Sequence, residues 1–219
     1  MIDISIIIIN HNRESFLERS LRSCVDQVVF NKKFEIIFVD DGSTDNSYKI
    51  AQKFLSNIRA YKLKKNMGIS YASNFALSKS KGEFFIRVDS DDFINKNTIN
   101  YLHDIMINNK NLAFTYCDHY KVDEFGYKEK IVKLKSKKLL KNHGAGVMFN
   151  KKKFLSYGAY NLKLQEAEDY EIISKILRKE KVFYLPIPLY RYYNHNKNIS
   201  NSGLRNSIIK KINKKLSSV

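Results

Sequence analysis

The chain has 219 residues, which suits one domain with an elaboration better than two independent domains. With 43% hydrophobic and 13% aromatic residues it can bury a core, so a disordered protein is excluded. The two cysteines, Cys24 and Cys117, are too few for a disulfide scaffold and lack zinc-site spacing, so we expect a reducing, cytoplasmic location. The formal net charge of +17 favours nucleic acid, an anionic membrane or a phosphorylated substrate as a partner.

This positive charge is concentrated in the C-terminal third of the chain. Residues 1–130 carry a net charge of +2, whereas residues 131–219 carry +15. The opening run MIDISIIII lacks the basic residues of a signal peptide, and its apolar run is far shorter than the 18 or so residues of a membrane span. We therefore expect no segment that crosses a bilayer.

The first half of the chain alternates predicted strands and helices. Three aliphatic runs of strand length predict strands buried on both faces, at residues 4–9, 34–39 and 84–88. An amphipathic helix should follow the first strand, with Ser15 and Glu18 as a capping box. A second helix should follow Ser43, with Leu55 among its inward residues, and a third should follow Gly68. This order predicts an α/β fold with a mostly parallel, doubly wound, Rossmann-like sheet, helices on both faces and ligands at the carboxyl ends of the strands.

The second half is less regular. The expected elements are a helix over 98–106, a strand over 112–117, a hairpin over 120–132, a strand over 144–149 and a helix over 169–177. Pro186 and Pro188 should interrupt a tyrosine-rich strand that ends near residue 194. In the final segment, 204–219, apolar residues recur every four positions and three lysines lie opposite them, although Arg205 falls on the apolar side. That pattern predicts a basic amphipathic helix, which suits either an anionic membrane surface or packing on the body.

Polar residues cluster where the three buried strands end, at residues 10–13, 40–45 and 89–92. Alternation along an extended backbone lets Asp89 and Asp91 point toward one bound group. Two hard carboxylates suit Mg²⁺ or Mn²⁺, whose other ligands are usually water and phosphate oxygens, so a nucleotide diphosphate is implied. The plain alternative is that these acids only end a strand and cap the next helix. Calcium-loop, phosphatase, dinucleotide and Walker A motifs are not matched.

Five segments in order resemble the family 2 glycosyltransferases of the GT-A fold: IIIINHNR, FVDDGSTD, KNMGISYASN, VDSDD and EAED. The resemblance covers roughly residues 2–200. It implies an inverting enzyme that moves a sugar from a nucleotide diphosphate sugar, with a UDP-sugar favoured, to a hydroxyl of a glycan or lipid-linked glycan in cell-surface polysaccharide synthesis. It also implies one domain over 1–203, with a donor-binding half over 1–118 and an acceptor-binding half over 119–203, before the helix at 204–219.

The resemblance assigns roles to individual residues. Asp41 would contact the uracil or ribose, with Asp40 less favoured, and His11 would stack on the base where the family has tyrosine. Asp91 and Asp89 would hold Mn²⁺ or Mg²⁺. Asp92 could substitute for one of them, and His195 could add a ligand. Positions that match the family's donor-binding motifs are Ile9, His11, Arg13, Asp41, Asn66, Gly68, Asn74, Asp89 and Ser90.

An inverting transfer needs a base for the acceptor hydroxyl and an electrophile for the leaving diphosphate. Asp169 matches the family's base, with Glu168 as the alternative, and an aspartate of ordinary pKa about 3.9 is ionised near neutral pH. Without the resemblance, Asp169 would read as an acid favoured at a helix N-terminus.

Two other functions compete with this interpretation. A nucleic-acid binder would explain the sequence pI of 9.7 and the tyrosines near residue 190, but not the acids at three strand ends. A nucleotidyltransferase of related architecture would need a glycine-rich basic loop after the first strand, which residues 10–13 do not form. We also expect peripheral association with the inner face of the cell membrane. Lysines on a solvated face are the plain alternative.

Overall fold

The computed structural model describes residues 2–135, 144–164, 166–194 and 202–217, with the side chains of 215–217 left aside. Its strands form one sheet in the order β3-β2-β1-β4-β8-β6-β9-β5, and β7 pairs with β6. The strands are β1 (Ile4–Asn10), β2 (Phe34–Asp40), β3 (Arg59–Lys62), β4 (Phe84–Asp89), β5 (Phe93–Ile94), β6 (Leu112–Val122), β7 (Lys128–Val132), β8 (Val147–Asn150) and β9 (Lys181–Tyr193).

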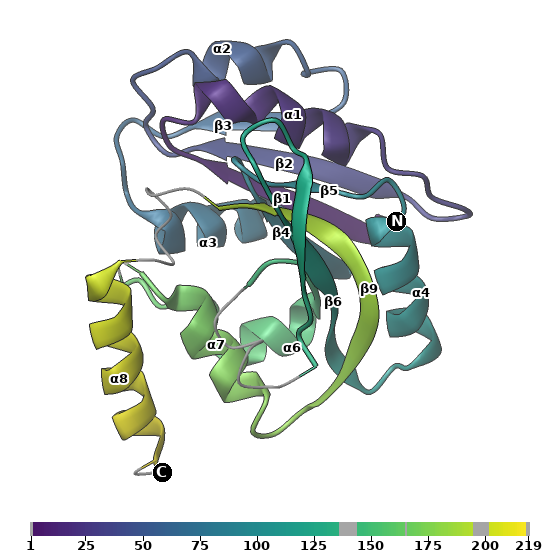
Figure 1. Cartoon of the computed structure of the whole chain (residues 1–219), viewed down its shortest axis with the longest axis vertical. Helices are drawn as coiled ribbons and strands as arrows, with labels where there is room; N and C mark the ends of the chain where they lie inside the picture. The colour runs from purple at the N-terminus through teal and green to yellow at the C-terminus, as the bar shows by residue number, and fades with distance from the viewer. Residues whose placement is uncertain (1, 136–143, 165, 195–201, 218–219) are drawn as a thin grey trace.

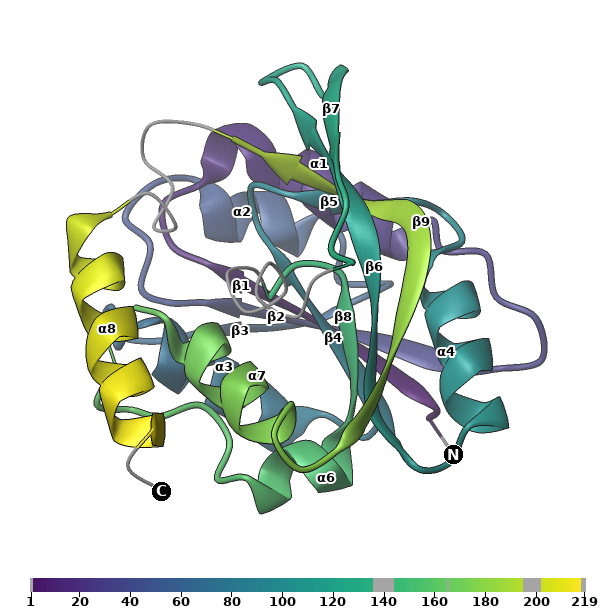
Figure 2. The same ribbon diagram turned by 60° about the horizontal axis from the view of Figure 1, so that its bottom comes forward.

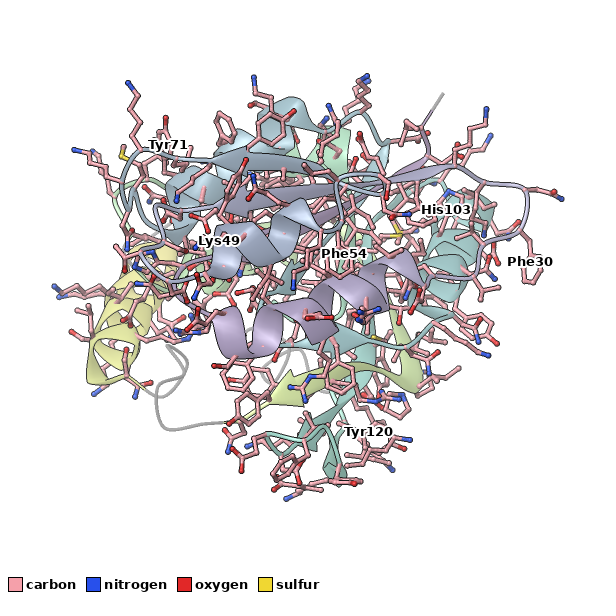
Figure 3. All side chains as sticks on the ribbon, turned by 90° about the horizontal axis from the view of Figure 1, so that it is seen from above. Phe30, Lys49, Phe54, Tyr71, His103 and Tyr120 are labelled. Atoms are coloured by element: carbon pink, nitrogen blue, oxygen red, sulfur yellow. The ribbon has the colours of Figure 1, made fainter. Side chains whose placement is uncertain are left out.

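The helices cover both faces of this sheet (Figure 1). Side chains of α1 (Glu14–Val25), α2 (Ser47–Gln52) and α4 (Thr98–Asn108) share one apolar core with the sheet. Those of α3 (Ile69–Lys79), α6 (Lys151–Ser156) and α7 (Glu168–Ile176) share a second core on the other face. Figure 3 shows α2 beside α1, where the Arg22 guanidinium lies 5.7 Å from the centre of the Phe54 ring. The doubly wound arrangement is as predicted.

The parallel part of the sheet brings the predicted strand ends together. β1 pairs in parallel with β2 and β4, and in this register Asn10 lies beside Asp40 and Ile9 beside Asp89. The predicted aliphatic strands are fully buried in their centres, which explains why their sequences show no polar alternation. Beyond β4 the direction changes, because β8 runs antiparallel to both β4 and β6.

Several local predictions differ from the structure. The capping box is absent: α1 begins at Glu14 after Arg13, and Glu18 instead pairs with Arg22 one turn later. α2 ends after six residues, so Leu55 lies outside it and is 53% exposed. The proline-rich strand is continuous, since a register shift opposite Cys117 and Asp118 takes up the extra residues. β3 and α6 were not expected, because each is short and has no clear apolar period.

The predicted C-terminal helix is present as α8 (Gly203–Ser217) and lies beside α7 in both ribbon views (Figures 1 and 2). Its residues Ile208, Ile209 and Ile212 pack against Tyr170 and Ala167. The Tyr170 hydroxyl donates a hydrogen bond to Asn213 at 2.6 Å. The isoleucines on this side of α8 therefore pack on the body, whereas Leu204 at the start of the helix is 48% exposed. Within the described residues, no helix is both long and apolar enough to span a bilayer.

Candidate functional site

The loop after β1 is fastened to the turn after β2. The His11 ring donates from Nδ1 to the Asp41 carbonyl at 2.9 Å, which leaves Nε2 as an acceptor for the Asn12 amide. Asn12, in a left-handed conformation with φ of 53°, accepts a hydrogen bond from the Thr44 backbone at 2.9 Å. The Asp41 carbonyl thus holds the His11 ring at the carboxyl end of β1. Ile9 belongs to the core beneath it and is 8% exposed.

The two aspartates of the second strand end are structural partners of neighbouring loops. Asp40 is fully buried and accepts from the Ser43 backbone at 2.7 Å. Asp41 is 3% exposed and accepts from the backbone N–H groups of Met67 and Gly68 at 2.7 and 2.9 Å. It therefore fixes the loop that begins α3 and lies at the strand end where the sequence predicts base recognition.

Glycine is required at the turn between these loops. Gly42 has φ of 68°, and a Cβ there would lie 2.3 Å from the carbonyl carbon of Lys65. Asn66 closes the crossing loop by accepting from the Gly68 N–H at 2.9 Å. Asn74 is engaged elsewhere, because its amide donates to the Tyr160 carbonyl at 2.7 Å and accepts from the Tyr160 N–H at 3.1 Å. Asn74 thus helps to hold the 157–160 loop, and its donor-binding role stays a prediction.

The third strand end holds the acidic cluster. Asp91 accepts from Arg13 Nε at 3.3 Å, with 14% of its side chain exposed, and 41% of the Asp89 side chain is exposed. Enclosure by surrounding protein raises the pKa of Asp89, the nearby carboxylates of Asp91 and Asp169 raise it further, and Arg87 lowers it. Ser90 is 4% exposed. The two carboxylates thus share a region in which additional positive charge would be favourable.

Asp92, expected as a substitute metal ligand, has both carboxylate oxygens in hydrogen bonds, and its metal role stays a prediction. It is 1% exposed, and its two oxygens accept from the Tyr190 hydroxyl and the Tyr193 backbone, both at 2.8 Å. These bonds fasten β9 to the end of β4. Burial raises the pKa of Asp92 well above its usual range, and the neighbouring acids Asp91 and Asp89 reinforce the effect.

The residues at the start of α7 face the same edge. Arg87 in β4 is 8% exposed and donates from Nη1 to Glu168 Oε1 at 2.8 Å, while its Nε lies 3.4 Å from Asp89 Oδ1. Its guanidinium also lies 5.2 Å from the centre of the Tyr160 ring. Arg87 therefore connects the carboxylate pair after β4 with the acidic start of α7.

Glu168 and Asp169 follow a strained residue. Ala167 is fully buried and has φ of 64°, a left-handed conformation that costs a non-glycine residue about 1–2 kcal/mol. Burial raises the pKa of Glu168, and Arg87 counters this in part. Burial also acts to raise the pKa of Asp169, but the charges of Arg205 and Arg87 outweigh it and hold that pKa below its usual value. Asp169 is therefore the better candidate for an ionised base.

Among the described residues, Asp169 has four hydrogen-bond contacts. Oδ1 accepts from the Tyr170 N–H at 2.7 Å and from Arg205 Nη2 at 3.0 Å, and Oδ2 accepts from the Gly144 N–H at 3.0 Å. The same Arg205 nitrogen lies 3.3 Å from Oδ2. The C-terminal helix thus reaches the predicted base.

The structure adds residues that the motifs did not identify, chiefly Arg87 and Arg205. A charged residue inside the apolar run 84–88 was the available signal for Arg87. For Arg205 the signal was its place on the apolar side of the C-terminal helix. The predicted ligand His195 lies outside the described residues.

The carboxylates of Asp89 and Asp91 suit a cation that takes only some of its ligands from the protein. Among the residues described, no group of three or more His, Cys, Asp or Glu side chains gathers as a metal cage. Mg²⁺ and Mn²⁺ commonly use one or two carboxylates together with water and phosphate oxygens. The exposed part of Asp89 and the repulsion between the two carboxylates are compatible with such a cation.

Comparisons with known proteins agree with this geometry. The family model described as glycosyl transferase family 2 matches residues 5–160. Poly(ribitol-phosphate) beta-N-acetylglucosaminyltransferase TarS of Staphylococcus aureus is 36% identical over 102 residues, which cover 45% of this chain and 18% of that protein. The chain therefore matches only a small part of the length of this relative.

Two solved structures share the fold. TarS of S. aureus in complex with UDP-GlcNAc superimposes with a TM-score of 0.81 at 22% identity, covering 99% of this chain and 66% of that one. The mannosyltransferase PcManGT from Pyrobaculum calidifontis, in complex with GDP-Man and Mn²⁺, gives a TM-score of 0.69 at 14% identity, covering 90% and 58%. Both are glycosyltransferases, and the mixed, curled sheet with helices on both faces is the GT-A fold. By its sequence match and its fold, the chain belongs to glycosyl transferase family 2.

Proposed function

We propose that the chain transfers a sugar from a nucleotide diphosphate sugar, with a UDP-sugar favoured, to a hydroxyl group of a glycan or lipid-linked glycan. The observation that carries the proposal is the juxtaposition of two acidic sites through one arginine. Arg87 lies 3.4 Å from Asp89 and 2.8 Å from Glu168, next to Asp169. A donor diphosphate and an acceptor hydroxyl have to meet at such a junction.

The donor would lie across the three strand ends. We assign base and ribose recognition to the region of His11 and Asp41, with Arg13, Asn66, Gly68 and Ser90 around it. The His11 ring is held there by the Asp41 carbonyl, and Asp41 keeps the adjoining loop in place through Met67 and Gly68. The TarS structure with UDP-GlcNAc, of the same fold, supports a UDP-sugar as the first donor to test.

Asp91 and Asp89 would hold Mn²⁺ or Mg²⁺. When bound, the ion would neutralise negative charge on the leaving diphosphate. Arg13, which reaches Asp91 at 3.3 Å, orients that carboxylate. Asp92 supports the cluster by holding β9 against the end of β4. His195 remains a predicted further ligand.

Asp169 would remove the proton from the acceptor hydroxyl. An aspartate whose pKa is held below its usual value is ionised at neutral pH, as a base must be before it acts. Its Oδ2 has the longer contacts of the two oxygens and is the atom that would take the proton. The acceptor hydroxyl then attacks the sugar's anomeric carbon from the side opposite the diphosphate, with inversion.

The acceptor is proposed to be anionic. The donor half carries almost no net charge, whereas residues 131–219 carry +15. Lys210, Lys211 and Lys214 on α8 are exposed, whereas on the opposite side Ile212 is buried and Ile208 and Ile209 are partly buried against the start of α7. Attraction of α8 to a membrane would therefore be electrostatic, without insertion of an apolar face. The family relative TarS, whose name gives poly(ribitol-phosphate) as its substrate polymer, supports a phosphate-rich acceptor.

Thermal unfolding with UDP, GDP, dTDP and CMP, each with and without Mn²⁺, tests donor and metal together. A ligand present at 100 times its Kd stabilises the folded chain by about 2.7 kcal/mol, which raises Tm by roughly 5–10 °C at this size. We expect that rise for UDP only with Mn²⁺, and none in Asp91→Asn. Asp26→Asn, an exposed aspartate after α1, is the matched control and should behave as the parent. Equal UDP and Mn²⁺ responses in Asp91→Asn and the parent would remove Asp91 from the site.

A further inference from the structure

We infer that Arg205 is a positioning residue for Asp169, so that docking of α8 on α7 is required for the transfer step rather than for donor binding. The inference rests on the proposed function, because it takes Asp169 as the base. It concerns a part of the chain beyond the segment that the family model matches, residues 5–160.

Arg205 and Asp169 form a buried pair. Arg205 is 6% exposed and Asp169 8% exposed, although α8 is otherwise a lysine-rich helix with mostly exposed charges. A buried arginine is stable only when its charge is paired, and the pairing here is with the carboxylate predicted to carry the reaction. One guanidinium nitrogen contacts both carboxylate oxygens, at 3.0 and 3.3 Å.

The second support is the way that Arg205 itself is fixed. Its backbone N–H donates to the Ser202 hydroxyl at 2.9 Å, and that hydroxyl in turn donates to Glu166. One turn and two turns farther along, Ile208 and Ile212 pack against Tyr170 and Ala167, the residues that flank the Glu168–Asp169 pair. The start of α8 and the start of α7 are therefore one packed unit, and the guanidinium has little freedom to leave.

The third support is the orientation that these contacts give the base. Tyr170 N–H and Arg205 hold Oδ1 from one side, and Gly144 N–H holds Oδ2 from the other. Without Arg205, the donors that remain to the carboxylate among the described residues are the backbone N–H groups of Tyr170 and Gly144, so it could rotate about its side-chain torsions. A base that is displaced by about 1 Å can lose a factor of about 100 in rate.

Other charged or titratable groups around Asp169 act on it as well. They are Glu168 on α7, Arg87 and Asp89 on β4, and the Tyr160 hydroxyl from the loop before α7. Arg87 is already shared between Glu168 and Asp89, and among the described residues Arg205 is the cation in direct contact with Asp169. Removal of Arg205 should therefore raise the pKa of Asp169 and move the acidic limb of the kcat profile to higher pH.

The test uses the full chain with four variants: Arg205→Met, Arg205→Lys, Asp169→Asn and the double variant Asp169→Asn/Arg205→Met. Arg178→Met is the matched control, since Arg178 is an exposed arginine just beyond α7. Nucleotide affinity is measured with UDP and Mn²⁺. Turnover is measured as UDP release from the UDP-sugar that binds, with water as acceptor, between pH 5 and 9. Carboxyl ¹³C NMR follows the titration of Asp169, assigned by its loss in Asp169→Asn.

We expect Arg205→Met to lower kcat by about 10–100-fold, to leave UDP affinity within twofold, and to shift both the acidic limb and the Asp169 titration to higher pH. Arg205→Lys should recover part of the rate, and the double variant should be no slower than Asp169→Asn. Arg178→Met should match the parent. If Arg205→Met fails to fold, Arg205→Lys carries the same comparisons.

The outcomes separate the inference from the proposed function. Normal turnover and an unshifted titration in Arg205→Met, with an inactive Asp169→Asn, would overturn the inference and leave the base in place. Loss of UDP affinity in Arg205→Met, or a further loss of rate in the double variant, would also overturn it, because Arg205 would then act on the donor. Full activity of Asp169→Asn would overturn the base and the inference together.

Discussion

Replacement of Arg87 by methionine should destabilise the fold strongly. Arg87 and its partner Glu168 have side chains only 8% and 4% exposed, so the substitution leaves a buried carboxylate without its cation. Breaking a buried pair in this way costs about 3–5 kcal/mol. For a chain of this length that corresponds to a fall in Tm of about 6–20 °C, since each kcal/mol is worth about 2–4 °C.

The loss of stability in Arg87→Met should depend on pH, and the direction of this dependence follows from the titration of Glu168. Burial raises the pKa of Glu168 in the folded chain, and the charge of Arg87 limits this rise. A carboxyl group with a raised folded pKa favours the folded state at low pH, and this contribution is lost as pH rises through that pKa. Without Arg87 the folded pKa rises further. The variant should therefore be closer to the parent at pH 5 than at pH 8.

Urea unfolding of the parent and of Arg87→Met at pH 5 and pH 8 measures the loss of stability and its dependence on pH. The matched control is Arg22→Met, which removes a helix-surface pair with Glu18 whose side chains are 64% and 46% exposed. That control should cost no more than about 0.5 kcal/mol at either pH. If the two variants lose the same free energy, or if Arg87→Met is more costly at pH 5, the buried-pair reasoning is wrong.

Three further predictions follow from the site. Asp169→Asn keeps the size of the side chain but cannot accept the proton, so kcat measured by UDP release should fall about 100-fold or more while UDP affinity stays within twofold; normal turnover would move attention to Glu168. Gly42→Ala should lower the free energy of unfolding in urea by about 2 kcal/mol or more, because the new Cβ clashes with Lys65 and the left-handed backbone is strained. The control Gly158→Ala, with φ of +93° and open space around it, should cost only the strain of about 1–2 kcal/mol, and equal costs would refute the clash. Binding to anionic vesicles should weaken as salt rises and drop when residues 204–219 are removed, and equal binding to neutral vesicles would exclude an electrostatic membrane role.

The first half of the fold was predictable because its signals are local. Continuous aliphatic runs mark strands buried on both faces, and the alternation of strands and helices then brings the strand ends to one edge. The sequence could therefore place Asp41, Asp89 and Asp91 at that edge, where their roles stay predictions. Their partners could not, since whether Asp41 faces solvent or the N–H groups of Met67 and Gly68 depends on a loop crossing that tertiary packing decides.

The surroundings of Asp169 were harder to predict because its partners are distant in sequence. Asp169 depends on Arg205, 36 residues later, and on Arg87, 82 residues earlier. Both arginines stood out in the sequence as charges within apolar patterns, and both prove to be buried in the site. Short elements such as β3 and α6 carry too few residues for their period to be visible.

The edges of the sheet also bear on how the chain behaves at high concentration. An open strand edge offers unpaired backbone groups to other molecules, and charge, proline or shortness reduces that hazard. In the part of the chain that the structure describes, β3 ends the sheet with Arg59 and Lys62, β5 is two residues long, and the outlying β7 is rich in lysine and glutamate. Among the described strands, β6 is the one that pairs with β9 over 181–189, and this stretch carries Pro186 and Pro188. The two prolines, which do not interrupt the strand, thus help to keep copies of this chain from joining edge to edge into aggregates.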